Sequence, residues 1–216
     1  MILSPGRGYV FIHIPKTGGT SLALALEARA MKEDIMLGDT PKALKRRRRV
    51  TDAQTRGRLW KHSTLADLDG LVPRETLLGL FAFTLVRNPW DRAVSYYHWL
   101  LGQAFDHPAV KLAQALDFEG FLGHPAIQKG FRDTPAASYM HRPDGGEHPA
   151  TYIRVEHFAA DAQPLFDHLG FRFDLPHANR SERPDDYRRA YSANSADIIS
   201  RVCAQDIARF GYRFEV

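Results

Sequence analysis

The sequence predicts an α/β fold in which helices cover both faces of a mostly parallel sheet. Two unbroken apolar runs, 9–14 and 80–86, are each followed at once by a segment of helical periodicity. A third strand is predicted over 151–155, before a helix that ends near Gly170. Continuous apolar runs are typical of strands buried on both faces, and alternation of strands with helices is typical of parallel sheets.

The first strand leads into a turn that suits an anion. Residues 11–21 read FIHIPKTGGTS, in which Pro15 ends the strand and Gly18 and Gly19 let a ligand approach the main chain. A strand, a glycine turn and a helix N-terminus aim several backbone N–H groups at one point, where a phosphate fits. Lys16 adds a positive charge. A tight connection without a ligand is the structural alternative, and it gives Lys16 no role.

The order of residues in this turn argues against a nucleotide-triphosphate loop. That loop reads G-x-x-x-x-G-K-[ST], with the lysine after the glycines. Here Lys16 precedes both glycines, and no glycine stands five residues before it. A nucleotide kinase therefore fits poorly.

The second strand ends at a candidate phosphate clamp. Residues 80–100 read LFAFTLVRNPWDRAVSYYHWL, with Arg87 at the strand end and Asn88 as the cap of a helix over 89–101. Ser95 lies two turns into that helix. A guanidinium at the carboxyl end of a strand and a hydroxyl can together hold a phosphate. Alternatively, Arg87 pairs with a surface acid and Ser95 is a packing residue, and this segment alone favours that simpler interpretation.

The sequence also predicts a core face for one helix, and further elements to which no functional residue is assigned at this point. Four residues at helical spacing are expected on the core face of the helix over 89–101: Trp90, Val94, Tyr97 and Leu101. The remaining predicted segments are a helix over 20–31, a basic region over 40–58, a short strand near 59–62, short helices and loops over 102–149, a loop over 172–186 and a last helix over 193–210.

Taken together, IPKTGGTS and LVRNPWDRAVSYY resemble the two cofactor-binding segments of sulfotransferases that use 3′-phosphoadenosine 5′-phosphosulfate (PAPS). The sequence of the two segments is most similar to that of sulfotransferase family 2, the branch that includes carbohydrate O-sulfotransferases and bacterial relatives. YIRVEHF (152–158) and DIARFGYRF (206–214) also resemble, less specifically, the family's later strand and closing helix. The resemblance implies a three-layer, P-loop-like core for the α/β fold.

The resemblance also implies roles for named residues. Arg87 and Ser95 would hold the 3′-phosphate of PAPS, which remains on the product adenosine 3′,5′-bisphosphate. The first segment would hold the 5′-phosphosulfate, through Lys16, Thr17, Gly18, Gly19, Thr20 and Ser21.

Sulfuryl transfer to a hydroxyl needs a base and stabilisation of the leaving phosphate, as phosphoryl transfer does. Lys16 is expected to act in catalysis as well as in binding. Together with the backbone donors of the turn it suffices to stabilise the leaving phosphate without magnesium. The chain has no dense Cys/His or carboxylate cluster for a metal. His62 lies 25 residues before Arg87, in an interval where the carbohydrate branch has a catalytic histidine. His98 and Glu156 remain alternatives as base, and His13 is expected to be structural.

Length and composition agree with a single domain over 1–216. The chain has 44% apolar residues, no repeats and no apolar run long enough to span a membrane. The start, MILSPGRGYV, lacks the charged-then-apolar layout of a signal peptide. Because animal Golgi members of the resembled family carry a membrane anchor, the resemblance implies a cytoplasmic, bacterial enzyme. Cys203, the only cysteine, is expected to be a packing residue. The sequence does not indicate an oligomeric state.

The basic run at 45–49 has two interpretations. It is either a solvated surface or a patch that attracts an anionic acceptor, such as an acidic glycan or a glycolipid head group. Nucleic acid is the poorer candidate partner, because the net charge is only +4 and no nucleic-acid-binding module is recognisable. The segments 102–149 and 172–186 are expected to wall the acceptor pocket. Beside the sulfotransferase, a nucleotide kinase and a non-catalytic anion- or nucleic-acid-binding module remain as alternatives.

Overall fold

The structure is a computed structural model that describes residues 1–176 and 186–214. It divides into two compact units, Met1–Val86 with Ala136–Asn179, and Arg87–Pro135 with Arg180–Val216. They are called here the sheet unit and the helical unit. Whether the chain acts as the single domain that the sequence predicts stays a prediction.

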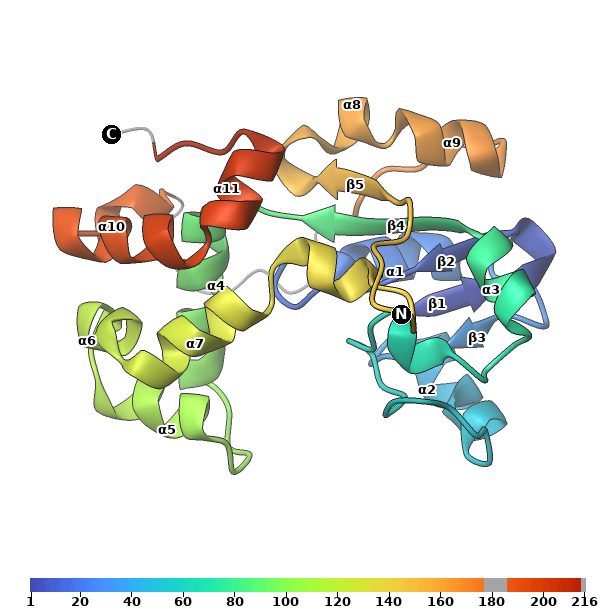
Figure 1. The fold of residues 1–216 in the computed structure, drawn as a ribbon, viewed down its shortest axis with the longest axis horizontal. Helices are drawn as coiled ribbons and strands as arrows, with labels where there is room; N and C mark the ends of the chain where they lie inside the picture. The colour runs from blue at the N-terminus through green and yellow to red at the C-terminus, as the bar shows by residue number, and fades with distance from the viewer. Residues whose placement is uncertain (177–185, 215–216) are drawn as a thin grey trace. The chain divides into compact units, whose positions relative to one another are not determined.

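The sheet unit is built on a five-stranded sheet in the order β3-β1-β2-β4-β5 (Figure 1). The strands are β1 Ile2–Ser4, β2 Tyr9–Phe11, β3 Ile35–Met36, β4 Phe81–Val86 and β5 Thr151–Arg154. β2, β4 and β5 are parallel, whereas β1 pairs antiparallel with both β2 and β3. The predicted α/β class is confirmed, and the sheet is mixed where a mostly parallel one was expected. The sequence patterns missed β1 and β3 because both strands are very short.

Both faces of the sheet are buried. Phe11 of β2 and Phe83 of β4 share a core cluster with Leu22 and Leu26 of helix α1. The residue that points the other way on β2, Val10, is also fully buried. Within this unit the sheet is therefore the middle of three layers. The helices of the unit are α1 Gly19–Glu27, α2 Pro41–Arg46, α3 Arg74–Gly79, α8 Phe158–Asp161 and α9 Gln163–Leu169.

The helical unit surrounds the indole of Trp90. Its Nε1–H donates to the carbonyl of Ala196 at 2.9 Å, and Tyr191 donates its hydroxyl to the carbonyl of Trp90 at 2.7 Å. Cys203 is buried in the same cluster, in agreement with its predicted packing role. The helices are α4 Pro89–Leu101, α5 Pro108–Ala115, α6 Phe118–Gly123, α7 Pro125–Asp133, α10 Ala193–Val202 and α11 Ala204–Phe210.

Two predicted elements differ from the structure. No strand forms near 59–62, where the described chain makes turns and bends. The predicted last helix is broken at Cys203 into α10 and α11. The helix at Gly170 ends as predicted, with that glycine in the left-handed conformation at φ 73°. The predicted loop at 172–186 lies largely outside the described residues.

Candidate active site

The glycine turn joins β2 to α1 through two left-handed residues. Gly18 has φ 86° and precedes the first residue of α1. Lys16 has φ 66°, the one positive φ recorded for a non-glycine residue in the described chain. A left-handed side-chain-bearing residue costs about 1–2 kcal/mol. Strain of this kind concentrates where a ligand is held.

The start of α1 presents main-chain N–H groups and no side-chain cap. Gly18 occupies the N-cap position and makes no side-chain cap bond. The first N–H groups of an α-helix lack acceptors within the helix, and the helix dipole places partial positive charge there. Because α1 has nine residues, this end suits an anion.

The hydroxyls of the turn are less available than the sequence suggests. Thr17 is buried and donates its hydroxyl to the carbonyl of Ile14 at 2.8 Å, so it stabilises the turn and can meet an anion only through its N–H. Ser21 is also buried, and its N–H donates to the carbonyl of Gly18 at 3.0 Å. Thr20 is half-buried.

The second glycine of the turn is required by a histidine. A Cβ on Gly19 would lie 2.1 Å from Cδ2 of His13, a distance that real atoms do not reach. The buried imidazole of His13 therefore packs directly against the start of α1. Burial lowers the pKa of His13 well below its usual value, with His62 and Lys61 adding to the effect, so the ring is neutral.

His62 is oriented by the main chain of His13. Its Nδ1–H donates to the carbonyl of His13 at 2.7 Å, and because a carbonyl only accepts, Nδ1 carries the proton. Nε2 is then left with a lone pair, which is the form that a general base needs. The His62 ring stands edge-on to His13 at 4.6 Å and to Trp60 at 5.0 Å between ring centres.

Burial also sets the protonation state of His62. Loss of solvent lowers its pKa to about 4, an effect that Lys61 reinforces and the bond to His13 opposes. The imidazole is consequently neutral at neutral pH. Through His13, the structure brings the predicted base to the glycine turn within the sheet unit.

The second predicted segment opens the helical unit. Asn88 caps α4 as predicted, accepting N–H bonds from Trp90 and Asp91 at 3.0 and 3.4 Å. Arg87 forms a salt bridge with Asp91, with its Nε and a terminal nitrogen 2.7 and 2.6 Å from one carboxylate oxygen. Ser95 follows Asp91 by one turn on the same face of α4 and is buried.

Asp91 is the residue of this segment that sequence reasoning left out. Its spacing of four from Arg87 was the available signal, because residues at i and i+4 meet on a helix surface. The salt bridge agrees with the simpler interpretation of Arg87, and it also fixes the orientation of the guanidinium fork. The structure thus holds the Arg87 guanidinium on Asp91, one turn before the buried Ser95.

The two alternative bases lie on other elements than His62. His98 is half-buried on α4, with its ring 5.6 Å from that of Tyr97. Glu156 is exposed in the 3₁₀ helix η5 Val155–His157, directly after Val155, whose Cγ2 would lie 3.2 Å from a Cβ on Gly18. Glu156 therefore follows a residue that packs on the glycine turn and stays an alternative base.

Grouped metal ligands and membrane-spanning helices are both absent from the part of the chain that the structure describes. Across 1–176 and 186–214, no three His, Cys, Asp or Glu side chains are grouped so that they could hold a metal ion. Over the same residues, no helix combines the length and the apolar character needed to cross a membrane.

Comparison with known proteins identifies the family and a likeness to a solved structure. Residues 1–144 match the model of the sulfotransferase family described as Sulfotransfer_2. No curated protein matches the chain. Among solved structures, the crystal structure of mouse sulfotransferase SULT7A1 complexed with PAP is 16% identical, with 95% of this chain and 67% of that chain covered at a TM-score of 0.37.

Proposed function

The chain belongs to the sulfotransferase family, whose members are PAPS-dependent transferases, and we propose that it moves the sulfuryl group of PAPS to a hydroxyl of a carbohydrate or glycolipid. The observation that carries the proposal is the bond from His62 Nδ1–H to the carbonyl of His13, whose ring packs on Gly19. This bond supports His62 as the general base, because it keeps the proton on Nδ1 and leaves the lone pair of Nε2 available to accept one.

The glycine turn is proposed to hold the 5′-phosphosulfate. Its donor set suits that group, because it combines the N–H groups at the start of a nine-residue helix with the charge of Lys16. Gly18, Gly19 and Thr20 would donate through the main chain, and so would Thr17, whose hydroxyl is engaged with Ile14. Ser21 completes the proposed set.

Arg87 and Ser95 are proposed to hold the 3′-phosphate. A guanidinium presents parallel N–H donors that match phosphate oxygens, and the Asp91 carboxylate holds the fork in place. Ser95 would add one hydrogen bond from its hydroxyl. These contacts distinguish a 3′-phosphorylated nucleotide from an ordinary adenine nucleotide.

The proposed reaction is a direct in-line transfer. The acceptor hydroxyl loses its proton to Nε2 of His62 as its oxygen forms the new bond to sulfur. The bond between sulfur and the bridging oxygen breaks, and its electron pair stays on the 5′-phosphate of the departing adenosine 3′,5′-bisphosphate. Lys16 and the N–H groups of the turn stabilise that growing charge, which is where fixed donors lower a barrier most.

Thermal unfolding with competing ligands tests the proposal. A ligand at 100 times its dissociation constant raises the free energy of unfolding by ~2.7 kcal/mol. Adenosine 3′,5′-bisphosphate should produce such a shift, whereas ATP with magnesium and a short oligonucleotide should not. A shift with ATP and none with the bisphosphate would replace the sulfotransferase with a kinase, and a shift with the oligonucleotide alone would favour the non-catalytic module.

The acceptor can be sought with the same protein. Labelled PAPS is offered together with glycans, glycolipids and simple phenols, and the sulfated products are identified by mass. Transfer to a glycan or glycolipid is the expected result. Transfer to phenols alone would keep the reaction and overturn the acceptor class.

A further inference from the structure

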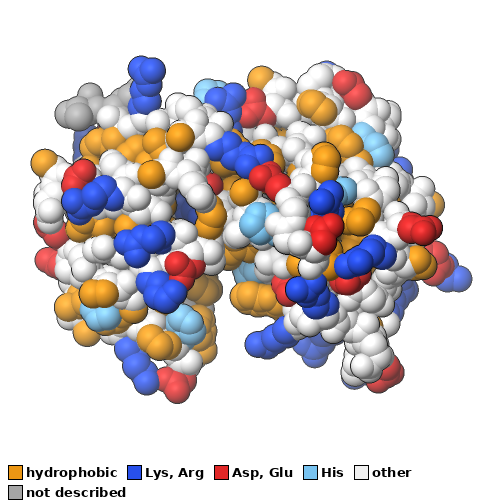
Figure 2. Space-filling view, viewed as in Figure 1, with side chains coloured by type: hydrophobic (Ala, Val, Ile, Leu, Met, Phe, Trp, Pro, Cys, Tyr) orange, Lys and Arg blue, Asp and Glu red, His pale blue; other side chains and the backbone are white. Residues whose placement is uncertain are grey.

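The positive charge of the chain is concentrated in one short stretch. Residues 42–61 contain nine Lys or Arg and one acid, Asp52, a net charge of +8 in a chain whose total is +4. This stretch is called here the basic segment. It covers α2 and the 3₁₀ helix η2 Arg47–Val50, and Figure 2 shows many Lys and Arg side chains around the place where Figure 1 labels α2. A charge density of this kind attracts anions.

Five of the nine basic side chains are bonded to other parts of the fold. Lys42 donates to the carbonyl of Glu27, Arg56 donates to that of Pro143, and Lys61 forms a salt bridge with Asp39. Arg46 and Arg49 are the other two. Arg46 donates to the carbonyls of Met31 and Asp34 at 2.7 and 3.3 Å, and Arg49 donates to the carbonyl of Lys32. These bonds attach α2 and η2 to the turn that precedes β3. The basic segment is therefore a folded part of the sheet unit with a defined surface.

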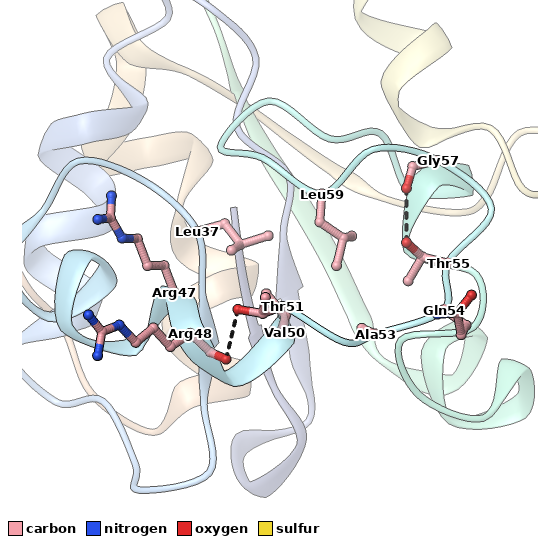
Figure 3. Close-up of a pocket in the computed structure, with 10 residues that line it drawn as sticks. All are labelled: Leu37, Arg47, Arg48, Val50, Thr51, Ala53, Gln54, Thr55, Gly57 and Leu59. Carbon is pink, nitrogen blue, oxygen red and sulfur yellow. Dashed lines mark hydrogen bonds between the residues drawn. The ribbon is translucent and has the colours of Figure 1, made fainter.

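The next two arginines have a different environment. Arg47 and Arg48 are exposed and line a cavity of about 580 Å³. Within the described chain neither forms a recorded ion pair. In Figure 3 both guanidinium groups extend to the same side of the cavity. They leave two cationic groups at its edge.

The rest of the cavity wall combines apolar and polar side chains. Leu37 and Leu59 are among the apolar ones, and Thr51, Gln54 and Thr55 are the polar ones (Figure 3). The Thr51 hydroxyl donates to the carbonyl of Arg48 at 3.1 Å, and the Thr55 hydroxyl donates to that of Gly57 at 2.9 Å. These bonds hold the loop around the cavity. A wall of mixed polarity with cations at the rim is suited to a ligand unit that has hydroxyl groups, a ring and a negative charge.

The cavity wall runs directly into the proposed catalytic region. Leu59 is followed by Trp60, whose ring is 45% exposed and stands 5.0 Å from that of His62. Leu59 and His62 are three positions apart in the sequence, so their Cα atoms are at most about 11 Å apart. An exposed indole offers a broad apolar face to a sugar ring.

We propose that the cavity binds a carboxylate- or sulfate-bearing sugar of an acidic oligosaccharide acceptor, with Arg47 and Arg48 contacting its charge and Trp60 stacking on the sugar presented to His62. This inference rests on the proposed function and names the acceptor class for the same site. A concave cavity favours an oligosaccharide over a membrane, because a bilayer surface is flat and does not enter it. Two cationic side chains line the cavity, which suits a sugar with a single charged group better than a nucleic-acid backbone, which is charged at every unit.

Calorimetric titration of the full chain with adenosine 3′,5′-bisphosphate present tests the binding. The probes are oligogalacturonate, its methyl ester of equal length and a heparin-derived tetrasaccharide. Both acidic probes should bind, and the ester, which differs by loss of charge alone, should bind at least tenfold more weakly, in line with about 1.4 kcal/mol. The affinity should fall as salt is raised, because the charges at the rim are exposed and the screening length is only about 8 Å at physiological salt.

A matched pair of variants tests the location. Arg47→Ala with Arg48→Ala should weaken the acidic probes about tenfold, because each exposed charge contact contributes less than about 1 kcal/mol. Lys129→Ala with Arg201→Ala removes the same charge from exposed positions of the helical unit and should leave probe binding unchanged. Trp60→Ala should weaken the acidic probes and the methyl ester by the same factor.

The outcomes separate this inference from the proposed function. Bisphosphate binding without binding of either acidic probe overturns the acidic acceptor and keeps the sulfotransferase. Equal loss in both double variants overturns the cavity as the site. Binding of an oligonucleotide or of phosphatidylserine vesicles that depends on Arg47 and Arg48, with no acidic-sugar binding, replaces the sugar with that partner. Failure of the wild-type chain to bind the bisphosphate removes the premise for both proposals.

Discussion

Lys16 combines a strained backbone with the charge proposed to meet the leaving phosphate. Replacement by glycine removes the charge and relieves the positive φ, which glycine adopts freely. We expect Lys16→Gly to raise the free energy of unfolding by up to about 1 kcal/mol. Its turnover should fall by about 10²–10³, as when an oxyanion donor is lost. Chemical unfolding and single-turnover rates measure the two effects.

Lys16→Ala is the control for that prediction. It removes the same charge and retains the strain, so it should lose as much turnover without the gain in stability. In both variants, affinity for the spent bisphosphate should fall less than turnover does, because the charge on the leaving group is greatest as the bond breaks. A larger loss of affinity than of turnover would make Lys16 a binding residue only.

His62 should determine the acidic limb of the rate profile. The neutral imidazole is the active form, and burial lowers its pKa to about 4. Activity should therefore be lost as pH falls through about 4, well below the usual range of histidine. His62→Ala should retain bisphosphate binding, lower turnover by ~10²–10⁴ and abolish this limb. Near-normal turnover with the same limb would pass the role to His98 or Glu156.

Arg87 should discriminate between nucleotides by their 3′ group. Arg87→Ala is expected to weaken adenosine 3′,5′-bisphosphate roughly tenfold to a hundredfold and adenosine 5′-phosphate little, since a charge-assisted contact contributes about 1.5–3 kcal/mol. Ser95→Ala should show the same selectivity at smaller size. Because Arg87→Ala leaves the Asp91 carboxylate without its partner, Arg87→Ala with Asp91→Asn is the matched control. Equal weakening of both nucleotides in that double variant would assign Arg87 to the fold.

At the level of single elements, the contact between α1 and His13 is the most sensitive to substitution. Gly19→Ala would place a Cβ 2.1 Å from His13, and that ring must then move. We expect a loss of about 1–3 kcal/mol in unfolding free energy, as in other overpacked sites. Turnover should fall as well, because the carbonyl of His13 orients His62. Unfolding curves and rates test both effects.

Gly130→Ala is the control for Gly19→Ala. Gly130 lies inside α7, and a Cβ there meets no atom within 4 Å. Alanine should stabilise this helix by about 0.5–1 kcal/mol. If Gly19→Ala also raised the free energy of unfolding, the conclusion that His13 packs directly against the start of α1 would be wrong.

The elements that sequence reasoning located are those with strong local signals. Asn88 with Pro89 marks the start of α4, and Gly170 marks the end of α9, because caps act through their nearest neighbours. The two-residue strand β3 has no such signal, since its pairing with β1 depends on residues more than thirty positions away. The break at Cys203 was missed for a different reason, because the apolar period of the helix continues through it.

The sequence predicted the core face of α4 with an error of one position at the end of the helix. Leu101 was expected in the core of α4 but is 41% exposed, while its neighbour Leu100 is 1% exposed. Both are leucines at the end of the helix, and only tertiary packing decides between them. The contact between His13 and His62 was likewise beyond sequence reasoning, because 49 residues separate them and no periodicity links them.

At the scale of the whole molecule, the buried neutral histidines should make the fold sensitive to acid. The pKa of His62 is lowered to about 4 and that of His13 is lowered well below its usual value, while both side chains titrate near 6.5 when unfolded. Between about pH 6.5 and 4 the unfolded chain therefore binds more protons than the folded one. The free energy of unfolding should decrease as pH falls through this window and be independent of these two groups above it.

The size of that pH dependence gives the test. Each histidine should contribute a slope of at most about 1.4 kcal/mol per pH unit, the value for one proton. In urea unfolding at a series of pH values, His62→Gln should reduce the slope by about one proton, because glutamine does not titrate. If His62→Gln kept the wild-type slope, burial would not lower the pKa of His62, and the ring would not be held neutral in the folded state at pH 5.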